Sequence, residues 1–292
     1  MSNLTTEDID AVCGLVDDLC GIYWDASKAY LIESRLSSLM RSSNAANYLD
    51  LVRKVRAGVA PGLKEQVIDA VTTNETLWFR DNSPFEALRH KVIPEVIDSK
   101  TKSLSPRRLR IWSAASSTGQ ESYSIAMALA DIIYDYQTWD IQIVGTDISP
   151  AAVAHAQQGR YNKLEVSRGL DVAYRDKYFV DEGDHWLVRD SLRKMCTFSV
   201  RNLHQPFIGL GPFDIVFCRN VAIYFTAPDR RSLFERMADT LTPSGWLFVG
   251  SSESLSDLGA RWAPQEHCRA TCYQPNLAKA YSPARLATAQ DW

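Results

Sequence analysis

The stretch LRIWSAASSTGQESYSIAMALADIIYDYQTWDIQIVGTD, residues 109–147, decides the fold. It begins with a short apolar run that ends in small residues, LRIWSAA (109–115), and an amphipathic helical pattern follows from about Glu121 to Tyr134. A second apolar run, IQIVGTD (141–147), then predicts a strand. Strand, helix and strand in this order predict a parallel βαβ unit, whose ligand crevice lies at the carboxyl ends of the strands.

The alternation continues beyond this unit and predicts a doubly wound α/β domain over residues 109–277. Its further pieces are the helix SPAAVAHAQ (149–157), the strand FDIVFC (213–218), the helix APDRRSLFERMADTL (227–241) and the strand WLFVGS (246–251). Between about 160 and 201 the pattern changes to mixed polar and aromatic sequence, which predicts an inserted β-subdomain.

The residues before this domain predict a different architecture. Residues 1–75 carry helical spacing, as in Ile32, Leu36 and Leu39, and predict a small all-helical domain. Residues 76–108 are interpreted as a connecting helix and linker, because 98–108, DSKTKSLSPRR, has linker composition. At the other end, residues 278–292 have little patterning and are interpreted as a loosely held tail.

Composition narrows the functional classes. The 292 residues are 46% hydrophobic with a formal charge of -3, which indicates a globular protein without the basic field of a general nucleic-acid binder. The first ten residues are polar and acidic, and no apolar run reaches the ~20 residues that cross a bilayer, so we expect a cytoplasmic protein without membrane insertion. Nothing indicates an obligate interface, and we expect a monomer.

The six cysteines are scattered and are expected to be reduced thiols. Cys268 and Cys272 beside His267 could be considered as metal ligands, but a fourth ligand is missing and CRATCY is typical of a terminal strand. We therefore expect no metal site.

Charge divides the predicted helical domain by sequence. Residues 1–25 hold six acids and no base, whereas residues 26–60 hold mostly bases. The bases are Lys28, Arg35, Arg41, Arg53, Lys54 and Arg56, against Glu33 and Asp50. This second half could face an acidic partner, or it could be an ordinary solvated helix surface.

Small residues follow the first strand of the sheet, in the run from Ser113 to Glu121. Such a run lets a ligand approach the backbone at a helix N-terminus, although it is not a dinucleotide fingerprint. Asp147 ends the second strand, where doubly wound folds use a carboxylate to accept hydrogen bonds from ribose hydroxyls. The two features favour a ribose-bearing ligand; the alternative is that Asp147 only caps the helix opening at Ser149 or Pro150.

Two further polar stretches are notable, the first beside the same crevice and the second upstream of the sheet. Cys218–Phe225, CRNVAIYF, follows the strand at 213–218 and carries Arg219 and Asn220. Thr72–Arg80, TTNETLWFR, places polar residues before an aromatic pair and an arginine. Taken singly, such residues also suit caps, surfaces or a helix packed in the core.

Together these pieces resemble the CheR family of chemoreceptor glutamate methyltransferases over nearly the whole chain. The motifs that carry the resemblance are TTNETLWFRD (72–81), WSAASSTGQESYSIAM (112–127), GTDIS (145–149), FDIVFCRNVAIYF (213–225) and SGWLFVGSSESL (244–255). The resemblance implies a class I S-adenosylmethionine-dependent methyltransferase with a Rossmann-like sheet. Its expected partners are the cytoplasmic methylation helices of chemoreceptors, whose glutamates it would convert to methyl esters in sensory adaptation.

The resemblance also implies roles for individual residues. The methyl donor S-adenosylmethionine would be bound by Asn74, Thr76, Arg80, Glu121, Asp147, Asn202, Leu203, Arg219 and Asn220. Arg35, Arg80 and Tyr224 would lie near the transfer site and position the incoming carboxylate.

Departures from the family pattern bear on the details. Gln120 and Ser122 stand where many members have Glu and Pro, and Ser251 and Ser252 where a histidine often precedes SESL. The β-excursion around 180–186 is shorter than in members that bind a receptor-tethered pentapeptide, so we expect a pentapeptide-independent enzyme. A methyltransferase with another acceptor and a non-catalytic donor sensor remain as alternatives.

Overall fold

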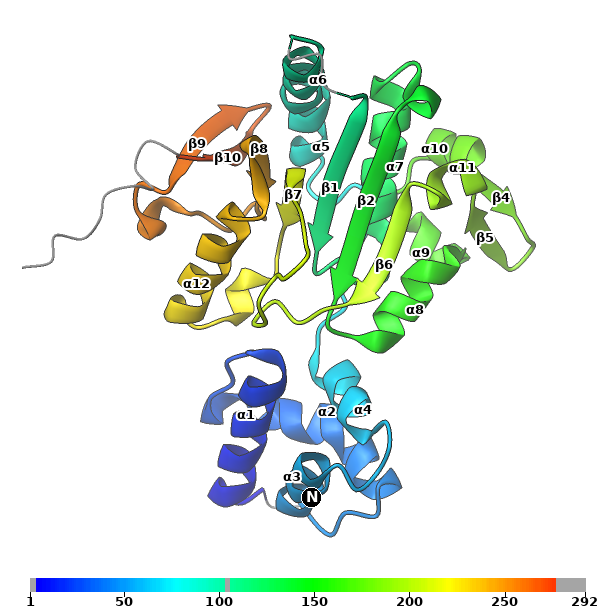
Figure 1. The fold of residues 1–292 in the computed structure, drawn as a ribbon. Helices are drawn as coiled ribbons and strands as arrows, with labels where there is room; N and C mark the ends of the chain where they lie inside the picture. The colour runs from blue at the N-terminus through cyan, green and yellow to red at the C-terminus, as the bar shows by residue number, and fades with distance from the viewer. Residues whose placement is uncertain (1–3, 103–105, 277–292) are drawn as a thin grey trace, which may run out of the picture.

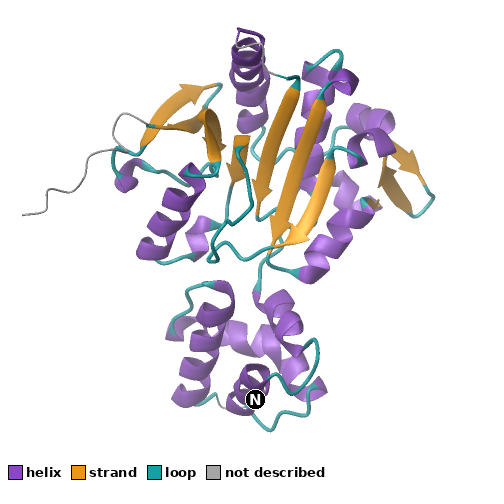
Figure 2. Cartoon of the chain, in the orientation of Figure 1, coloured by secondary structure: helices purple, strands orange, loops and turns teal. Residues whose placement is uncertain are grey.

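The computed structural model describes residues 4–102 and 106–276. The chain forms two parts: a helical bundle at the N-terminal end, and a sheet with helices on both faces (Figures 1 and 2). The predicted tail, 278–292, lies outside the described residues. None of the described helices is both long and apolar enough to span a bilayer.

The helical part encloses an apolar core of its own. Its described helices are α1 Thr6–Cys20, the 3-10 turn η1 Ala26–Lys28, α2 Ala29–Ser42, α3 Tyr48–Ala57 and α4 Leu63–Val71. Helix α1 begins with a capping box in which Thr5 and Asp8 each accept a hydrogen bond from the other's backbone N–H. The core between the helices includes Val16, Leu36 and Leu51. Removal of these apolar side chains from water stabilises the bundle.

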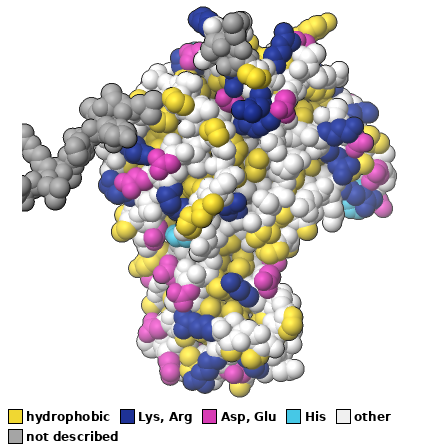
Figure 3. Space-filling view, in the orientation of Figure 1, with side chains coloured by type: hydrophobic (Ala, Val, Ile, Leu, Met, Phe, Trp, Pro, Cys, Tyr) yellow, Lys and Arg dark blue, Asp and Glu magenta, His cyan; other side chains and the backbone are white. Residues whose placement is uncertain are grey.

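The division of charge along the sequence does not persist in space. Helices α1 and α3 pack side by side, and Arg56 of α3 lies 2.7 Å from Asp18 of α1. On the face drawn in Figure 3, basic and acidic side chains are interspersed over the helical part. The basic stretch at 26–60 is therefore mixed with acids from 1–25.

The segment predicted as linker is largely helical. After α5 Ser83–Ala87 come the π-helical turn η2 Leu88–Val92 and α6 Ile93–Lys102, and β1 already begins at Arg108. Ile93 and Val96 are buried, and Lys100 Nζ lies 2.8 Å from Asp214 Oδ1 of the sheet. The interpretation of 98–108 as a linker was thus wrong for both ends of that range, because packing against the sheet overrides a polar local composition.

The main sheet confirms the predicted doubly wound α/β class. Its strands are β1 Arg108–Ala114, β2 Asp140–Asp147, β6 Cys196–Val200, β7 Phe213–Cys218, β8 Leu241–Phe248, β9 Trp262–His267 and β10 Ala270–Pro275. They lie in the order β6-β2-β1-β7-β8-β10-β9, parallel from β6 to β8, with β10 antiparallel to both its neighbours. The strand order reverses between β1 and β7, which is where such sheets bind ligands.

Helices cover both faces of this sheet (Figure 2). They are α7 Gln120–Ile132, α8 Pro150–Gln158 and α12 Ala227–Ala238, with 3-10 turns η3 Tyr136–Thr138, η4 Ala222–Tyr224 and η5 Ser256–Leu258. Successive strand residues point to opposite faces: Ile111 packs in the core that contains α7, whereas Trp112 packs in the core that contains α12.

The inserted subdomain is smaller than predicted. It contains β3 Arg160–Asn162, β4 Phe179–Asp181 and β5 His185–Val188, with α9 Lys163–Ser167, α10 Val172–Tyr178 and α11 Asp190–Arg193. Its sheet has the order β3-β5-β4. Residues 196–200, predicted to belong to it, instead form β6 and pair in parallel with β2. Buried Cys196 packs in the main core, which explains the difference.

The end of α1 is fitted closely against the sheet part. A Cβ added to Gly21 would lie 1.9 Å from His204 Nε2, and Gly21 has a left-handed backbone with φ of +65°. The His204 ring packs edge-on against Phe225, with ring centroids 4.4 Å apart. Two residues on, Tyr23 N donates to Tyr224 O at 2.9 Å. The two parts therefore meet through backbone and not only through mobile side chains.

Candidate active site

A cavity lies between the helical part and the carboxyl ends of β1, β2 and β7. Its empty space measures about 920 Å³ when the open mouth is included. Ten of the eleven residues predicted for the site line it. They are Asn74, Thr76, Arg80, Glu121, Asp147, Asn202, Leu203, Arg219, Asn220 and Tyr224. Arg35 is the exception.

The loop after β1 forms one side of the cavity. Ala115 and Ser117 line it and have left-handed backbones, with φ of 59° and 51°. The loop turns into α7 at Gly119, where an added Cβ would lie 2.8 Å from the Cβ of Ala156, so glycine alone fits. Ser117 Oγ also donates to Asn74 O at 2.9 Å. This hydrogen bond ties the loop to the segment that joins the two parts.

Asp147, at the end of β2, is buried beside this loop. Its Oδ2 accepts from Ser117 N at 2.8 Å, and its Oδ1 accepts from Ser149 N at 2.9 Å. Burial raises the pKa of the Asp147 carboxyl, although these backbone donors oppose the shift. The N-cap of α8 is Ser149, whose Oγ accepts from Ala152 N. Asp147 is therefore not the capping residue that the alternative interpretation required.

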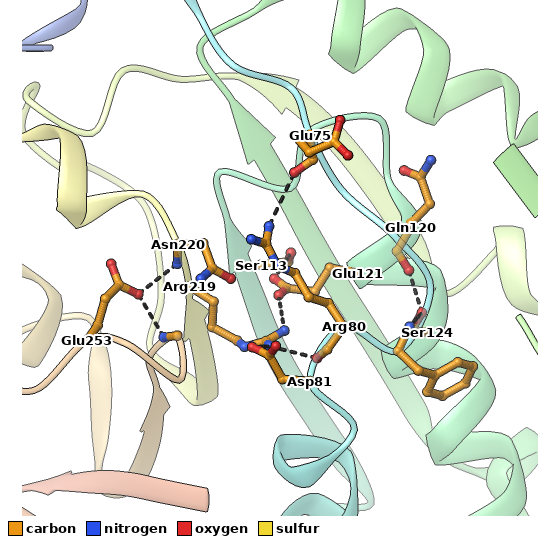
Figure 4. A network of polar contacts seen from close by, with 12 residues as sticks. Glu75, Arg80, Asp81, Ser113, Gln120, Glu121, Ser124, Arg219, Asn220 and Glu253 are labelled. Atoms are coloured by element: carbon orange, nitrogen blue, oxygen red, sulfur yellow. Dashed lines mark hydrogen bonds and ion pairs between the residues drawn. The ribbon is translucent and has the colours of Figure 1, made fainter. Parts of the chain in front are cut away.

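Arg219, after β7, is the centre of a buried charge cluster (Figure 4). Its side chain is 1% exposed. Nη1 lies 3.0 Å from Glu121 Oε2, and Nη2 donates to Asp81 Oδ2 at 2.8 Å and to the Arg80 carbonyl at 2.7 Å. The other oxygen of Glu121 accepts from Ser113 Oγ at 2.8 Å. Two carboxylates thus offset the cost of burying one guanidinium.

Asn220 is held by its backbone, which leaves its side chain at the cavity. The Asn220 N–H and the Gly250 N–H both donate to Glu253 Oε2 at 2.7 Å, and Asn220 has a φ of 57°. Asn220 Oδ1 and Arg219 Nε are buried and lack a hydrogen-bond partner within the described parts of the chain. Such atoms fit a polar ligand that would satisfy them.

The helical part supplies the opposite wall. Cys20 and Ile22, at the end of α1, line the cavity. Asn202 Nδ2 donates to Leu19 O at 2.9 Å and so links this wall to the loop after β6. Burial raises the pKa of the Cys20 thiol to about 12, so the thiol is neutral and presents an apolar surface.

Arg80 and Tyr224 lie where the cavity meets solvent. The Tyr224 side chain is partly exposed. Arg80 Nη1 donates to the Glu75 carbonyl at 3.2 Å, as Figure 4 shows. Both side chains line the cavity, so a guanidinium and a phenol lie on its partly exposed side.

Arg35 lies outside the cavity lining, contrary to its predicted place near the transfer site. Its Nη1 donates to the carbonyls of Val71 at 2.5 Å and Thr72 at 3.0 Å, and its Nη2 donates to Thr73 Oγ1 at 2.9 Å. It therefore satisfies carbonyl groups at the end of α4 that the helix leaves free. Its contact with the site is indirect, through the segment that leads into the cavity.

For three residues of the site, no role was predicted from the sequence. Asp81 and Glu253 stand within the quoted motifs TTNETLWFRD and SGWLFVGSSESL, so the signal was present but no role was attached to them. Cys20 stands in α1 with no local signal at all. Its contribution arises only because α1 ends against the sheet part.

Among the described residues, no three or more His, Cys, Asp or Glu side chains are grouped so that they could hold a metal ion. Cys268 is exposed in the turn before β10, and Cys272 is buried within β10. The terminal strand predicted for CRATCY is confirmed.

Comparisons with known proteins agree with the two-part organisation. The model of the CheR methyltransferase all-alpha domain matches residues 7–72, and that of the CheR methyltransferase SAM-binding domain matches residues 74–270. The chain is 42% identical to the chemotaxis protein methyltransferase Cher2 of Pseudomonas putida over 247 residues, which is 83% of this chain and 88% of that protein. It is also 42% identical to the chemotaxis protein methyltransferase 1 of Pseudomonas aeruginosa, with the same coverage.

Proposed function

This chain belongs to the CheR methyltransferase family and is an S-adenosylmethionine-dependent chemotaxis methyltransferase. We propose that its methyl acceptors are glutamate side chains on the cytoplasmic methylation helices of chemoreceptors. The products would be glutamate methyl esters and S-adenosylhomocysteine. The observation that carries the proposal is a single cavity that joins a buried carboxylate, Asp147, to a mouth lined by Arg80 and Tyr224.

The inner part of the cavity suits the donor. Asp147 would accept hydrogen bonds from the ribose hydroxyls, and Asn202 and Leu203 would frame the adenine. Arg219 and Asn220 would flank the methionine end, where the unpartnered Nε and Oδ1 atoms offer one donor and one acceptor. Asn74, Thr76 and Glu121, which also line the cavity, would complete the binding surface.

The mouth of the cavity suits an acceptor carboxylate. When bound, S-adenosylmethionine supplies a methyl group on a positively charged sulfonium. A glutamate side chain, with an ordinary pKa of about 4.3, is already ionised at neutral pH and needs no general base. The protein therefore has to align the carboxylate, and proximity of this kind contributes roughly 7–11 kcal/mol. Arg80 would orient it by a charge-assisted hydrogen bond, with Tyr224 beside it.

Arg35 takes a different role in this proposal from the one first predicted. Because it donates to Val71 O, Thr72 O and Thr73 Oγ1, it would position the segment that carries Asn74 and Thr76. We propose Arg35 as a positioning residue and not as a group that touches the acceptor.

The surface that meets the receptor would include exposed bases of α2 and α3. Arg41 and Arg53 are exposed, whereas Arg56 is paired with Asp18. Acidic methylation helices would favour the exposed guanidiniums. The proposed receptor surface thus rests on individual residues and not on a uniform basic face. Action as a monomer in the cytoplasm is part of the same proposal.

The inserted subdomain supports independence from a receptor-tethered pentapeptide. Strands β4 and β5 are three and four residues long, and three residues, 182–184, connect them. Such a short hairpin offers little edge for strand addition by a peptide. Calorimetry of the purified protein with the C-terminal pentapeptide of a receptor should give no binding; micromolar binding would refute this part.

The main test is transfer of labelled methyl from S-adenosylmethionine to membranes that contain chemoreceptors, scored as base-labile ester. Asp147→Ala should lose the label, and Asp10→Ala, an exposed carboxylate of α1, should keep it. Tight donor binding by the wild type with no ester on any receptor would point to another acceptor or to a non-catalytic donor sensor.

A further inference from the structure

The chain around Arg80 adopts an unusual backbone. Phe79, Asp81 and Asn82 have positive φ angles of 48°, 69° and 44°. Residues other than glycine disfavour this conformation and keep it only where surrounding contacts enforce it, often at functional sites. Three such residues flank Arg80, so something must hold this turn.

One side of the turn is fixed by Phe79. Its backbone N–H donates to Ser124 Oγ of α7 at 3.1 Å. Its ring packs against Phe85 and Tyr174, with centroid distances of 5.0 and 4.8 Å. These contacts anchor the residue before Arg80 to the sheet part.

The other side is fixed by Arg219. One nitrogen, Nη2, donates both to the Arg80 carbonyl at 2.7 Å and to Asp81 Oδ2 at 2.8 Å (Figure 4). The guanidinium of Arg80 itself makes a weaker contact, 3.2 Å from the Glu75 carbonyl. The backbone of the turn therefore determines where the Arg80 side chain enters the cavity.

We propose that Asp81 is a positioning residue for Arg80: its carboxylate and Arg219 clamp the left-handed turn, so that the Arg80 guanidinium is presented to the ligands of the cavity. This inference rests on the proposed function in so far as Arg80 contacts donor and acceptor. Glu121 remains as the second carboxylate beside Arg219. Removal of Asp81 thus leaves the buried cation compensated, and the main consequence is a loosened turn.

A double-mutant cycle on donor-site affinity tests this inference without any acceptor protein. The affinity for S-adenosylhomocysteine is measured by calorimetry for the wild type, Arg80→Ala, Asp81→Ala and the double variant. We expect Asp81→Ala to weaken binding roughly tenfold, the size of one charge-assisted hydrogen bond. In the Arg80→Ala background the same change should cost less than about twofold, because the group that Asp81 positions is gone.

Two further variants separate positioning from general stability. Asp81→Asn keeps an oxygen that accepts from Arg219 and should bind within about threefold of the wild type. Asp214→Ala breaks another partly buried ion pair, with Lys100 at the far end of β7, and should lower the melting temperature without changing the affinity.

The possible results decide the matter. A loss from Asp81→Ala that disappears in the Arg80→Ala background, with rescue by Asp81→Asn, supports positioning. A loss that persists in that background, no loss at all, or a loss equally large in Asp81→Asn would overturn it. Failure of the wild type to methylate receptors would refute the proposed acceptor and would leave this binding cycle readable.

Discussion

Gly21 offers the sharpest test of how the two parts of the chain are joined. Gly21→Ala would place a Cβ 1.9 Å from His204 Nε2, far inside contact distance, at a φ of +65°. The ring has little freedom to move away because it packs against Phe225 and because the backbone N–H of His204 donates to Asn202 Oδ1 at 2.9 Å. The substitution must therefore shift α1 away from the sheet part or displace the ring.

The cost has two components that the structure separates. The left-handed backbone costs an alanine about 1–2 kcal/mol, and forcing extra volume into a packed contact costs a further 1–3 kcal/mol, roughly. Gly58 is the matched control, since its φ is +63° and no atom lies within 4 Å of an added Cβ. Gly58→Ala should thus show the first component only.

The assay is denaturation of the variants together with calorimetric affinity for S-adenosylhomocysteine. Gly21→Ala should be destabilised by about 2–5 kcal/mol, the sum of both components, and Gly58→Ala by about 1–2 kcal/mol. Gly21→Ala should also bind the ligand more weakly, because Cys20 and Ile22 line the cavity, whereas Gly58→Ala should bind normally.

His204→Ala provides the internal check. In that background the additional cost of Gly21→Ala should fall to the backbone component of about 1–2 kcal/mol. The reasoning would be refuted if Gly21→Ala were no more harmful than Gly58→Ala, or if its cost were the same with and without the His204 ring.

Three other predictions follow from the site and the helical part. Burial raises the pKa of Asp147, and ribose hydroxyls would favour the ionised form of its carboxyl. The affinity for S-adenosylhomocysteine, measured by calorimetry, should therefore fall as the pH is lowered through that raised pKa. The affinity of Asp147→Asn should not change with pH over the same range. Arg41→Glu combined with Arg53→Glu should reduce methylation of receptors while donor affinity stays unchanged, and equal loss of both would contradict an interface role. Thr5→Ala removes the capping box of α1 and should lower the free energy of unfolding by about 0.5–2 kcal/mol, measured by denaturant titration.

Local patterns predicted the sheet well. FDIVFC coincides with β7, Phe213–Cys218, because all six side chains are buried and the apolar run is continuous. The run from Ser113 to Glu121 indicated a loop that a ligand can approach, and this loop does line the cavity through Ala115 and Ser117. In both cases the physical cause lies within a few neighbouring residues.

Long-range contacts explain what the sequence did not reveal. Residues 196–200 form a main-sheet strand because they pair with β2, which lies some fifty residues earlier in the chain. Arg35 points to the end of α4 and not into the cavity because Val71 and Thr72 present free carbonyls there. Neither partner can be identified from the sequence near 196 or near 35.

The cavity has Cys20 and Ile22 in one wall and residues 201–203 in another, so a ligand that fills it touches both parts at once. At a concentration of one hundred times its Kd, such a ligand stabilises the assembled form by about 2.7 kcal/mol. A bound ligand would thus help to hold the helical part and the sheet part together. Two fragments separated near residue 72 should reassociate more tightly when such a ligand is present, which would turn the pair into a reporter of methyl-donor concentration.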